Sequence, residues 1–275
     1  MSSAAVRAPI VSPPSPDSIF SELPRGPLPI FPRSALATAR VMQLPVVPAS
    51  RLEIRPAPPT VPTGIATLDA LTGGLPRGAL TEFFGPASSG RTSVLISAIA
   101  QATHRQELCA LVDVGDAFHP ESARAAGINC ERLLWVRCSG NRWERRMEQA
   151  LKTTDLLLQG GGFGMIAVDL GDVPPQFARR IPLTSWFRFR RAVENTPSVL
   201  LVVEQEPYAK TCASLVLRME PTARNSRRSA QSDPRPTHAE ILHGLSIEAE
   251  VVHARVPKKP AQSAAVFEAA TPWAG

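Results

Sequence analysis

The sequence lacks most of the features that mark secreted, membrane-spanning or metal-binding proteins. None of its hydrophobic runs reaches the length of about 18 residues that suggests a membrane span, and the N-terminus has no apolar signal region. Its four cysteines show neither CxxC spacing nor a nearby histidine pattern, which argues against a metal site: Cys109, Cys130, Cys138 and Cys212. We therefore expect a protein of the reducing cytoplasm, without a membrane partner.

Lysine is scarce as well. Only Lys152, Lys210, Lys258 and Lys259 are found among the 30 basic residues, so arginine supplies most of the positive charge. The net charge of +6 favours an acidic partner such as nucleic acid. A hydrophobic content of 44% in 275 residues is enough for one sizeable domain with additional tails.

The first 60 residues are rich in proline, which removes hydrogen-bond donors and interrupts helices. We expect residues 1–60 to form a largely disordered arm. Within it, Gln43-Leu-Pro-Val-Val47 faintly resembles the short peptides that bind bacterial sliding clamps, but two positions depart from that pattern. We interpret it as linker, so a sliding clamp is not an expected partner.

A glycine-rich segment, Gly85-Pro-Ala-Ser-Ser-Gly90-Arg91-Thr92, lies between an apolar run at residues 80–84 and a helical pattern at residues 91–104. A strand, a glycine loop and a helix in this order are typical of a Walker A loop, whose N–H groups bind phosphates. The sequence therefore predicts ATP or ADP at Gly85, Pro86, Ala87, Ser88, Ser89, Gly90, Arg91, Thr92 and Ser93, with Thr92 as a Mg²⁺ ligand.

One position of this loop departs from the Walker A pattern. Arg91 stands where a lysine normally reaches the second and third phosphates. Arginine keeps the positive charge, but its planar guanidinium is bulkier than an ammonium group. Nucleotide binding is expected on these grounds, whereas turnover is not implied.

Apolar strands alternate with helical patterns along the rest of the chain. Residues 108–114, 165–169 and 198–203 are apolar runs of strand length, and helical patterns cover residues 144–158 and 183–195. This alternation predicts an α/β fold with a mostly parallel central sheet flanked by helices. Asp169 ends a buried strand, as a Walker B aspartate does, so we predict that it holds Mg²⁺; a lone aspartate there could also be a turn former.

The remaining segments are interpreted as turns, strands or flexible regions. Gly160-Gly-Gly-Phe-Gly164 could be a second phosphate loop, but no helix start or lysine follows, so a turn is expected. Residues 215–219 and 245–255 are predicted late strands, and the polar, arginine-rich residues 221–240 a mobile basic loop. The predicted core is 61–256, followed by a flexible tail at 257–275.

The order of these motifs resembles the core of bacterial RecA over roughly residues 61–256. The matching stretches are Pro62-Thr-Gly-Ile-Ala-Thr-Leu-Asp69, Gly73-Gly-Leu-Pro-Arg-Gly78, the phosphate loop, Ala125-Ala-Gly-Ile128, Val168-Asp169 and Gln205. The resemblance implies a RecA-like P-loop ATPase core that works on DNA, with Gln205 as a further nucleotide-site residue.

Departures from RecA fall at functional positions. Gly115 stands where RecA has the glutamate that activates water, and Asp116 is one residue too late to replace it. Only about ten residues follow Gln205 before the next strand, so a long DNA-binding loop is largely missing. Two lysines that act across RecA subunits align with His253 and Arg255. The resemblance therefore implies a pseudo-ATPase without an assigned catalytic residue.

A RecA-like body that has lost these parts is most similar to ImuA, a RecA-related accessory family of DNA repair and the SOS DNA damage response. That resemblance implies a role in translesion synthesis, with a Y-family DNA polymerase or RecA as partner, in the bacterial nucleoid. A DNA-dependent ATPase recombinase of the RecA type is the alternative. Another degenerate RecA paralogue, or a nucleotide-binding regulator without a DNA role, also stays open.

Five arginines follow the Walker B strand, and no acidic residue lies among residues 179–191. Arginines there would neutralise phosphates and give salt-dependent, sequence-independent binding of single-stranded DNA. A solvated helix face is the competing interpretation. The predicted DNA-binding residues are Arg179, Arg180, Arg188, Arg190 and Arg191.

Overall fold

The computed structural model describes residues 58–222, 244–255 and 262–270, and all structural statements below concern these residues. The predicted proline arm lies outside them except for residues 58–60. The predicted basic loop lies outside except for Pro221 and Thr222. No helix within the described ranges is long and apolar enough to cross a membrane.

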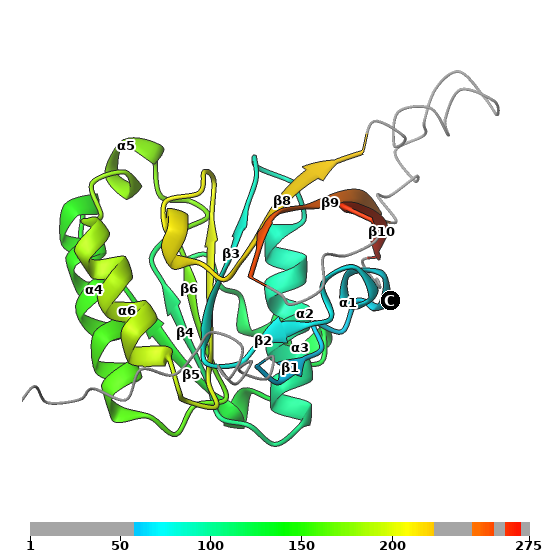
Figure 1. Cartoon of the computed structure of the whole chain (residues 1–275). Helices are drawn as coiled ribbons and strands as arrows, with labels where there is room; N and C mark the ends of the chain where they lie inside the picture. The colour runs from blue at the N-terminus through cyan, green and yellow to red at the C-terminus, as the bar shows by residue number, and fades with distance from the viewer. Residues whose placement is uncertain (1–57, 223–243, 256–261, 271–275) are drawn as a thin grey trace, which may run out of the picture. The chain divides into compact units, whose positions relative to one another are not determined.

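The fold is α/β, as the alternation of strands and helices predicted (Figure 1). A two-stranded antiparallel sheet is formed by β1 (Thr60–Val61) and β2 (Leu75–Pro76). The strands of the main sheet are β3 (Ala79–Phe84), β4 (Cys109–Asp113), β5 (Leu133–Arg137), β6 (Met165–Asp169), β7 (Val199–Glu204), β8 (Leu215–Pro221), β9 (Gly244–Ala254) and β10 (Ala264–Ala270). The helices are α1 (Ala66–Thr72), α2 (Arg91–His104), α3 (Pro120–Ala125), α4 (Trp143–Gly160), α5 (Pro175–Ala178) and α6 (Leu183–Val193), with short 3₁₀ turns at Cys130–Arg132 and Lys210–Cys212.

The main sheet has the order β10-β9-β8-β3-β7-β6-β4-β5. The six neighbouring strands from β8 to β5 are parallel to one another. Strand β9 pairs antiparallel with β8 on one side and with β10 on the other. One buried cluster joins α1, α2 and α3 to one face, and a second joins α4, α5 and α6 to the other, as Figure 1 also shows. Burial on both faces explains the continuous apolar runs of the central strands.

The register of the parallel strands places four carboxyl ends side by side. Phe84 at the end of β3 pairs with Glu204 of β7, and Asp169 of β6 pairs with Val203. Asp113 at the end of β4 pairs with Asp169. Ligands of open parallel sheets bind outside this edge, so the register brings the predicted site residues to one place.

The flexible tail predicted for residues 257–275 is wrong for its middle part. Ala264–Ala270 forms β10, which pairs with β9 along its whole length. Phe267 is buried, and Ala265 and Ala269 pack against the core beside α1. Because alanine has little preference for strands, the alternation of these small residues was a weak sequence signal.

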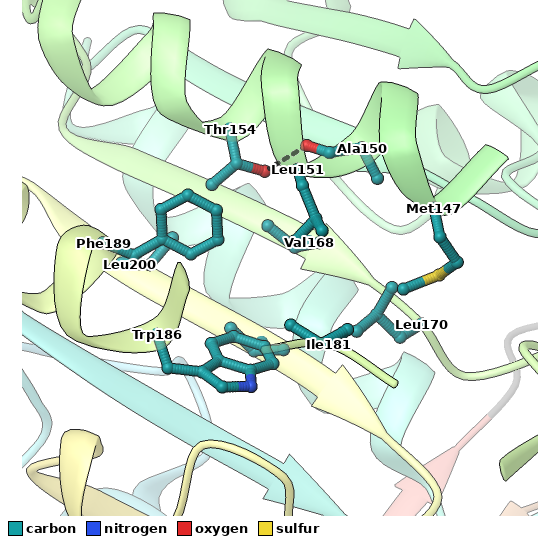
Figure 2. Close-up of a pocket in the computed structure, with 11 residues that line it drawn as sticks. Met147, Ala150, Leu151, Thr154, Val168, Leu170, Ile181, Trp186, Phe189 and Leu200 are labelled. Carbon is teal, nitrogen blue, oxygen red and sulfur yellow. Dashed lines mark hydrogen bonds between the residues drawn. The ribbon is translucent and has the colours of Figure 1, made fainter. Parts of the chain in front are cut away.

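The core between α4, α6 and the sheet is nearly filled. A cavity of about 10 Å³ remains there, and Figure 2 shows that the residues lining it are almost all apolar. The hydroxyl of Thr154 donates to the carbonyl of Ala150, 2.8 Å away on the preceding helical turn, so it places no free polar group in the cavity. A space of this size and character holds no ligand, and we interpret it as a packing defect.

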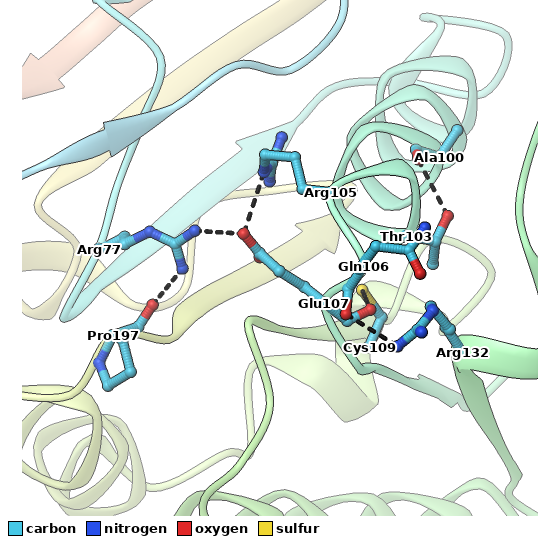
Figure 3. Close-up of polar contacts among 9 residues, drawn as sticks. All are labelled: Arg77, Ala100, Thr103, Arg105, Gln106, Glu107, Cys109, Arg132 and Pro197. Carbon is cyan, nitrogen blue, oxygen red and sulfur yellow. Dashed lines mark hydrogen bonds and ion pairs between the residues drawn. The ribbon is translucent and has the colours of Figure 1, made fainter.

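A polar cluster links the segments that precede β3, β4 and β7 (Figure 3). It lies at the amino ends of these strands, opposite the aligned carboxyl ends. Glu107 accepts hydrogen bonds from Arg77 at 2.5 Å and from Arg105 at 3.0 Å, and Arg77 also donates to the carbonyl of Pro197. Burial of Glu107 opposes ionisation, but the hydrogen bonds and charges of Arg105 and Arg77 outweigh it and lower its pKa. The carboxylate therefore contributes stability only while it is ionised.

Replacing this carboxylate tests its contribution. Glu107→Gln should reduce the free energy of unfolding at pH 7 by about 1–3 kcal/mol, because two half-buried arginines lose their counterion. The difference from wild type should shrink as the pH falls below the ordinary glutamate pKa of 4.5, where the wild-type carboxylate is protonated too. Urea unfolding at several pH values measures both effects. Glu148→Gln, which breaks an exposed pair with Lys152, should leave stability nearly unchanged, because solvent screens exposed ion pairs.

Candidate nucleotide site and DNA interface

The predicted phosphate loop connects β3 to α2, as the sequence pattern indicated. Pro86, Ala87 and Ser88 are exposed, and the loop ends at Gly90, which precedes the first turn of α2. Ser88 and Gly90 have positive φ angles of 59° and 81°. Left-handed residues in such a turn form backbone concavities that bind anions, and the helix N-terminus adds partial positive charge.

The back of the loop packs against β8 and β9, and this contact requires glycine at two positions. A Cβ atom on Gly85 would lie 2.1 Å from the carbonyl oxygen of Met219. A Cβ atom on Gly90 would lie 2.0 Å from Cδ1 of Ile247. The loop is therefore pressed onto the antiparallel extension of the sheet, and any side chain at either glycine would displace it.

Arg91 does not extend freely toward the loop concavity. Its guanidinium donates to the carbonyl of Glu204 at 2.5 Å and to that of Gly171 at 3.5 Å, and only 8% of the residue is exposed. Burial lowers the pKa of Arg91, although the charges of Asp169, Asp172 and Glu204 oppose the shift. The side chain thus joins the phosphate loop to the ends of β7 and β6.

Asp169 lies at the end of β6, in the place that the Walker B pattern predicts. Its Oδ1 accepts a hydrogen bond from the N–H of Gly171 at 2.8 Å. Burial, together with the charges of Asp113 and Asp172, raises the pKa of Asp169 to about 6, against the effects of Gly171 and Arg91. A carboxylate in this environment gains from a nearby cation, which is consistent with a metal ligand.

The end of β4 offers no free carboxylate in place of Gly115. Asp113 accepts hydrogen bonds from the N–H groups of Ala117 and Phe118 and from the indole of Trp135. Asp116 pairs with Arg137 at 2.7 and 2.8 Å and points elsewhere, as predicted.

Another carboxylate lies against Gly115. A Cβ atom on Gly115 would lie 3.0 Å from Oδ2 and 3.1 Å from Cβ of Asp172, an exposed residue of the segment after β6. This approach could not be predicted from the sequence, because the two residues lie on different elements. Glycine at 115 thus leaves room for Asp172.

Gln205, predicted as a nucleotide-site residue, is bonded to the segment after β6. Its Nε2 donates to the carbonyls of Gly171 at 2.9 Å and Val173 at 3.1 Å. Arg91 and Gln205 therefore share the carbonyl of Gly171 as an acceptor. The structure brings Arg91, Asp169 and Gln205 together at one edge of the sheet.

Two buried glutamates lie beneath this edge, and sequence reasoning missed their role. Glu82 accepts hydrogen bonds from the N–H groups of Tyr208 at 2.6 Å and Ala209 at 2.9 Å. Burial and the neighbouring Glu82 carboxyl raise the pKa of Glu204 well above its ordinary value. The signal available in the sequence was a glutamate inside each of two apolar strands, where an acid needs a specific partner.

The five predicted DNA-binding arginines do not form one patch. Arg179 pairs with Glu206 at 2.8 Å, on the segment after β7, whereas Arg188 pairs with Asp155 on α4 at 2.9 Å. Arg180 lies over the ring of Phe177 and 4.0 Å from Glu144. The remaining two occupy the last turn of α6, where cations suit the helix dipole: Arg190 and Arg191.

Arg179 lines a cleft of about 490 Å³ formed by the segment before α6 and the short segment after β7. Lys210 and the ring of Tyr208 contribute to the same lining, with apolar walls from Ile181, Leu183 and Pro207. Cations beside an aromatic ring are the combination that binds single-stranded nucleic acid. Lys210 and Tyr208 were missed because neither belongs to the arginine run.

With this geometry in place, comparisons with known proteins identify what the chain is similar to. Residues 46–174 match the family model of the RecA N-terminal domain. RecA of Cutibacterium acnes is 40% identical over 111 residues, which are 40% of this chain and 30% of that protein. RecA of Salinispora tropica is 40% identical over 123 residues, 43% of this chain and 34% of that protein. These matches support a RecA-like family.

The sequence matches cover a smaller share of this chain than the structural match does. The chain spans about a third of the length of the curated relatives that it matches. The crystal structure of the RadB recombinase aligns with a TM-score of 0.52 and 18% identity, covering 74% of this chain and 94% of that one. The structural match shows a shared fold, and it includes parts of the core beyond the sequence match.

The contact between loop and sheet extension can be tested by substitution. Gly85→Ala should reduce the free energy of unfolding by about 1–3 kcal/mol, because the added methyl group meets the carbonyl of Met219. Gly160→Ala is the matched control, since a Cβ there would have no neighbour within 4 Å, and it should be neutral or stabilising. Thermal and urea unfolding measure both. Equal stability of the two variants would contradict the proposed packing.

Proposed function

We propose that this chain is a RecA-like nucleotide- and DNA-binding accessory protein of DNA repair, and that it is not a strand-exchange recombinase. The observation that carries this proposal is the end of β4, where Gly115 supplies no side chain and Asp113 is fully engaged. The resemblance to ImuA further favours a role in SOS translesion synthesis, with a Y-family DNA polymerase or RecA as partner.

The phosphate loop fits a nucleotide. Ser89 Oγ is buried beside the loop and has no hydrogen-bond partner among the described residues, so a bound phosphate could satisfy it. Residues 85–93 would hold the phosphates of ATP or ADP, and Thr92 and Asp169 would hold Mg²⁺. When bound, the metal would neutralise phosphate charge.

Hydrolysis should be slow even when a nucleotide binds. The attacking water needs a base or an orienting group, and Gly115 provides neither. The amide of Gln205 is occupied by the carbonyls of Gly171 and Val173. The phosphate loop is thus retained, whereas position 115 carries no side chain that would activate water.

We expect measurable affinity for ATP or ADP with ATP hydrolysis near background. Loss of a positioned general base typically costs about 10²- to 10⁴-fold in rate. Phosphate release from purified protein, with Asp169→Ala as the control for contaminating ATPases, measures the rate. Arg91→Lys with Gly115→Glu should stay inactive, because the new carboxylate would lie against Asp172. Wild-type turnover at ordinary RecA-like rates, lost in Asp169→Ala, would refute the pseudo-ATPase assignment.

The cleft beside Arg179 is our candidate DNA contact. The segment from 206 to 214 is short and tightly held, since Glu82 binds the N–H groups of Tyr208 and Ala209. Arg179 can exchange Glu206 for a DNA phosphate at small cost, because solvent screens exposed ion pairs and leaves them little net stability. Weak binding of single strands, without pairing of homologous strands, follows from the small contact area.

DNA binding should depend on the two cations of this cleft. Arg179→Ala with Lys210→Ala should weaken binding of a single-stranded oligonucleotide and reduce the salt slope by about 1.4 units, if each cation neutralises one phosphate. Fluorescence anisotropy at several salt concentrations gives the slope. Lys152→Ala, on the exposed side of α4, should leave it unchanged. An unchanged slope in the double variant would remove the cleft from the DNA interface, and parallel variants at Arg180, Arg188, Arg190 and Arg191 would test the other predicted contacts.

A DNA-dependent recombinase of the RecA type is the second candidate. The similarity to RecA proteins and to the RadB recombinase favours it. Electron microscopy with ATP and single-stranded DNA, together with a strand-exchange assay, separates the two candidates. Long regular filaments and strand exchange would support the recombinase. A gene for a Y-family polymerase beside this one would favour the accessory role.

A further inference from the structure

Three side chains around the segment that follows β6 are arranged in a way that the proposed function leaves unexplained. Arg91 and Gln205 both donate to the carbonyl of Gly171, at 3.5 and 2.9 Å. Asp172, the next residue, lies against Gly115. A Cβ atom on Gly171 would lie 2.9 Å from Oδ1 of Asp169 and 3.8 Å from Nη2 of Arg91, so these charged groups converge on one point.

We expect the outermost phosphate of a nucleoside triphosphate to lie near this point, because Arg91, the basic residue of the loop, ends here. In a P-loop the backbone amides hold the inner phosphates, and the basic residue of the loop reaches the outer ones. A side chain on the neighbouring strand end then orients the attacking water. The third phosphate is therefore contacted by groups at the carboxyl ends of the strands beside the loop.

In this chain those groups are bonded elsewhere. The guanidinium of Arg91 is bound to the carbonyls of Glu204 and Gly171, and the amide of Gln205 is bound to the same segment. A negative charge is added by Asp172, whose Oδ2 would be 3.0 Å from a Cβ on Gly115. Pro86, Ala87 and Ser88 of the loop, in contrast, are exposed to solvent.

We propose that the site selects nucleoside diphosphates over nucleoside triphosphates, with Asp172 as the residue that sets this specificity. The inference rests on the proposed nucleotide binding. Loop amides and the N-terminus of α2 would bind two phosphates, while the carboxylate of Asp172 repels a third. A protein of this kind would bind the product of ATP hydrolysis in preference to ATP.

Electrostatics sets the size of the expected preference. Two like charges separated by a few ångströms at a partly exposed site interact strongly enough to change an affinity by about tenfold. The wild-type dissociation constant for ADP should therefore be about tenfold lower than that for ATP. Asp172→Asn removes the charge and keeps the size, so the ratio should fall to about one- to threefold, through tighter binding of ATP.

Equilibrium binding to the full chain tests the proposal. ADP, ATP and a non-hydrolysable ATP analogue are titrated by calorimetry in excess MgCl₂, with wild type, Asp172→Asn and Asp172→Ala. Asp155→Asn is the matched control, because it removes one carboxylate on α4 and should leave the ratio unchanged. Thermal melting confirms that each variant is folded.

The outcomes separate this inference from the proposed function. Binding of ADP with at least fivefold preference over both triphosphates, lost in the Asp172 variants alone, supports the inference. Equal affinity for di- and triphosphate, or a preference that the Asp172 variants retain, overturns it while leaving nucleotide binding intact. Binding of neither nucleotide overturns the proposed nucleotide binding and this inference together.

Discussion

The contact of the Arg91 guanidinium with the ends of β7 and β6 is the interaction on which the rest of the site depends. It exists because the parallel register places Glu204 beside the end of β3, from which the phosphate loop begins, and Asp169 beside β7 on the next strand. A shorter ammonium group presents no planar fork with which to join two carbonyls. Arginine at position 91 therefore connects the phosphate loop after β3 to the end of β7 and to the segment after β6.

Two buried glutamates, Glu82 of β3 and Glu204 of β7, lie next to this edge of the sheet. Glu82 fixes the segment after Gln205 through the N–H groups of Tyr208 and Ala209, while Glu204 is held with a raised pKa beside it. Because a buried carboxylate is costly unless it is hydrogen-bonded, the two N–H groups that bind Oε1 of Glu82 favour one conformation of the segment. Tyr208, in this restrained segment, also lines the cleft that we propose as a DNA contact.

Much of the fold could be predicted from the sequence, because its signals are local. The strand, glycine loop and helix around Arg91 follow one another within about 25 residues, and each has its own local pattern. The predicted α/β fold with its mostly parallel sheet is confirmed. The bonding of Arg91 and the approach of Asp172 to Gly115 could not be predicted, because both depend on strand register between distant segments. Strand β10 was not predicted, because alanine has little preference for strands.

The position of β10 has a consequence for how the molecule is made. This strand pairs with β9 and packs beside α1, so the beginning of the core is covered by residues from near the end of the sequence. Contacts of such long sequence separation form late and slow folding. During synthesis the emerging core would keep an apolar surface uncovered until β10 leaves the ribosome, which gives chaperones a defined interval in which to act.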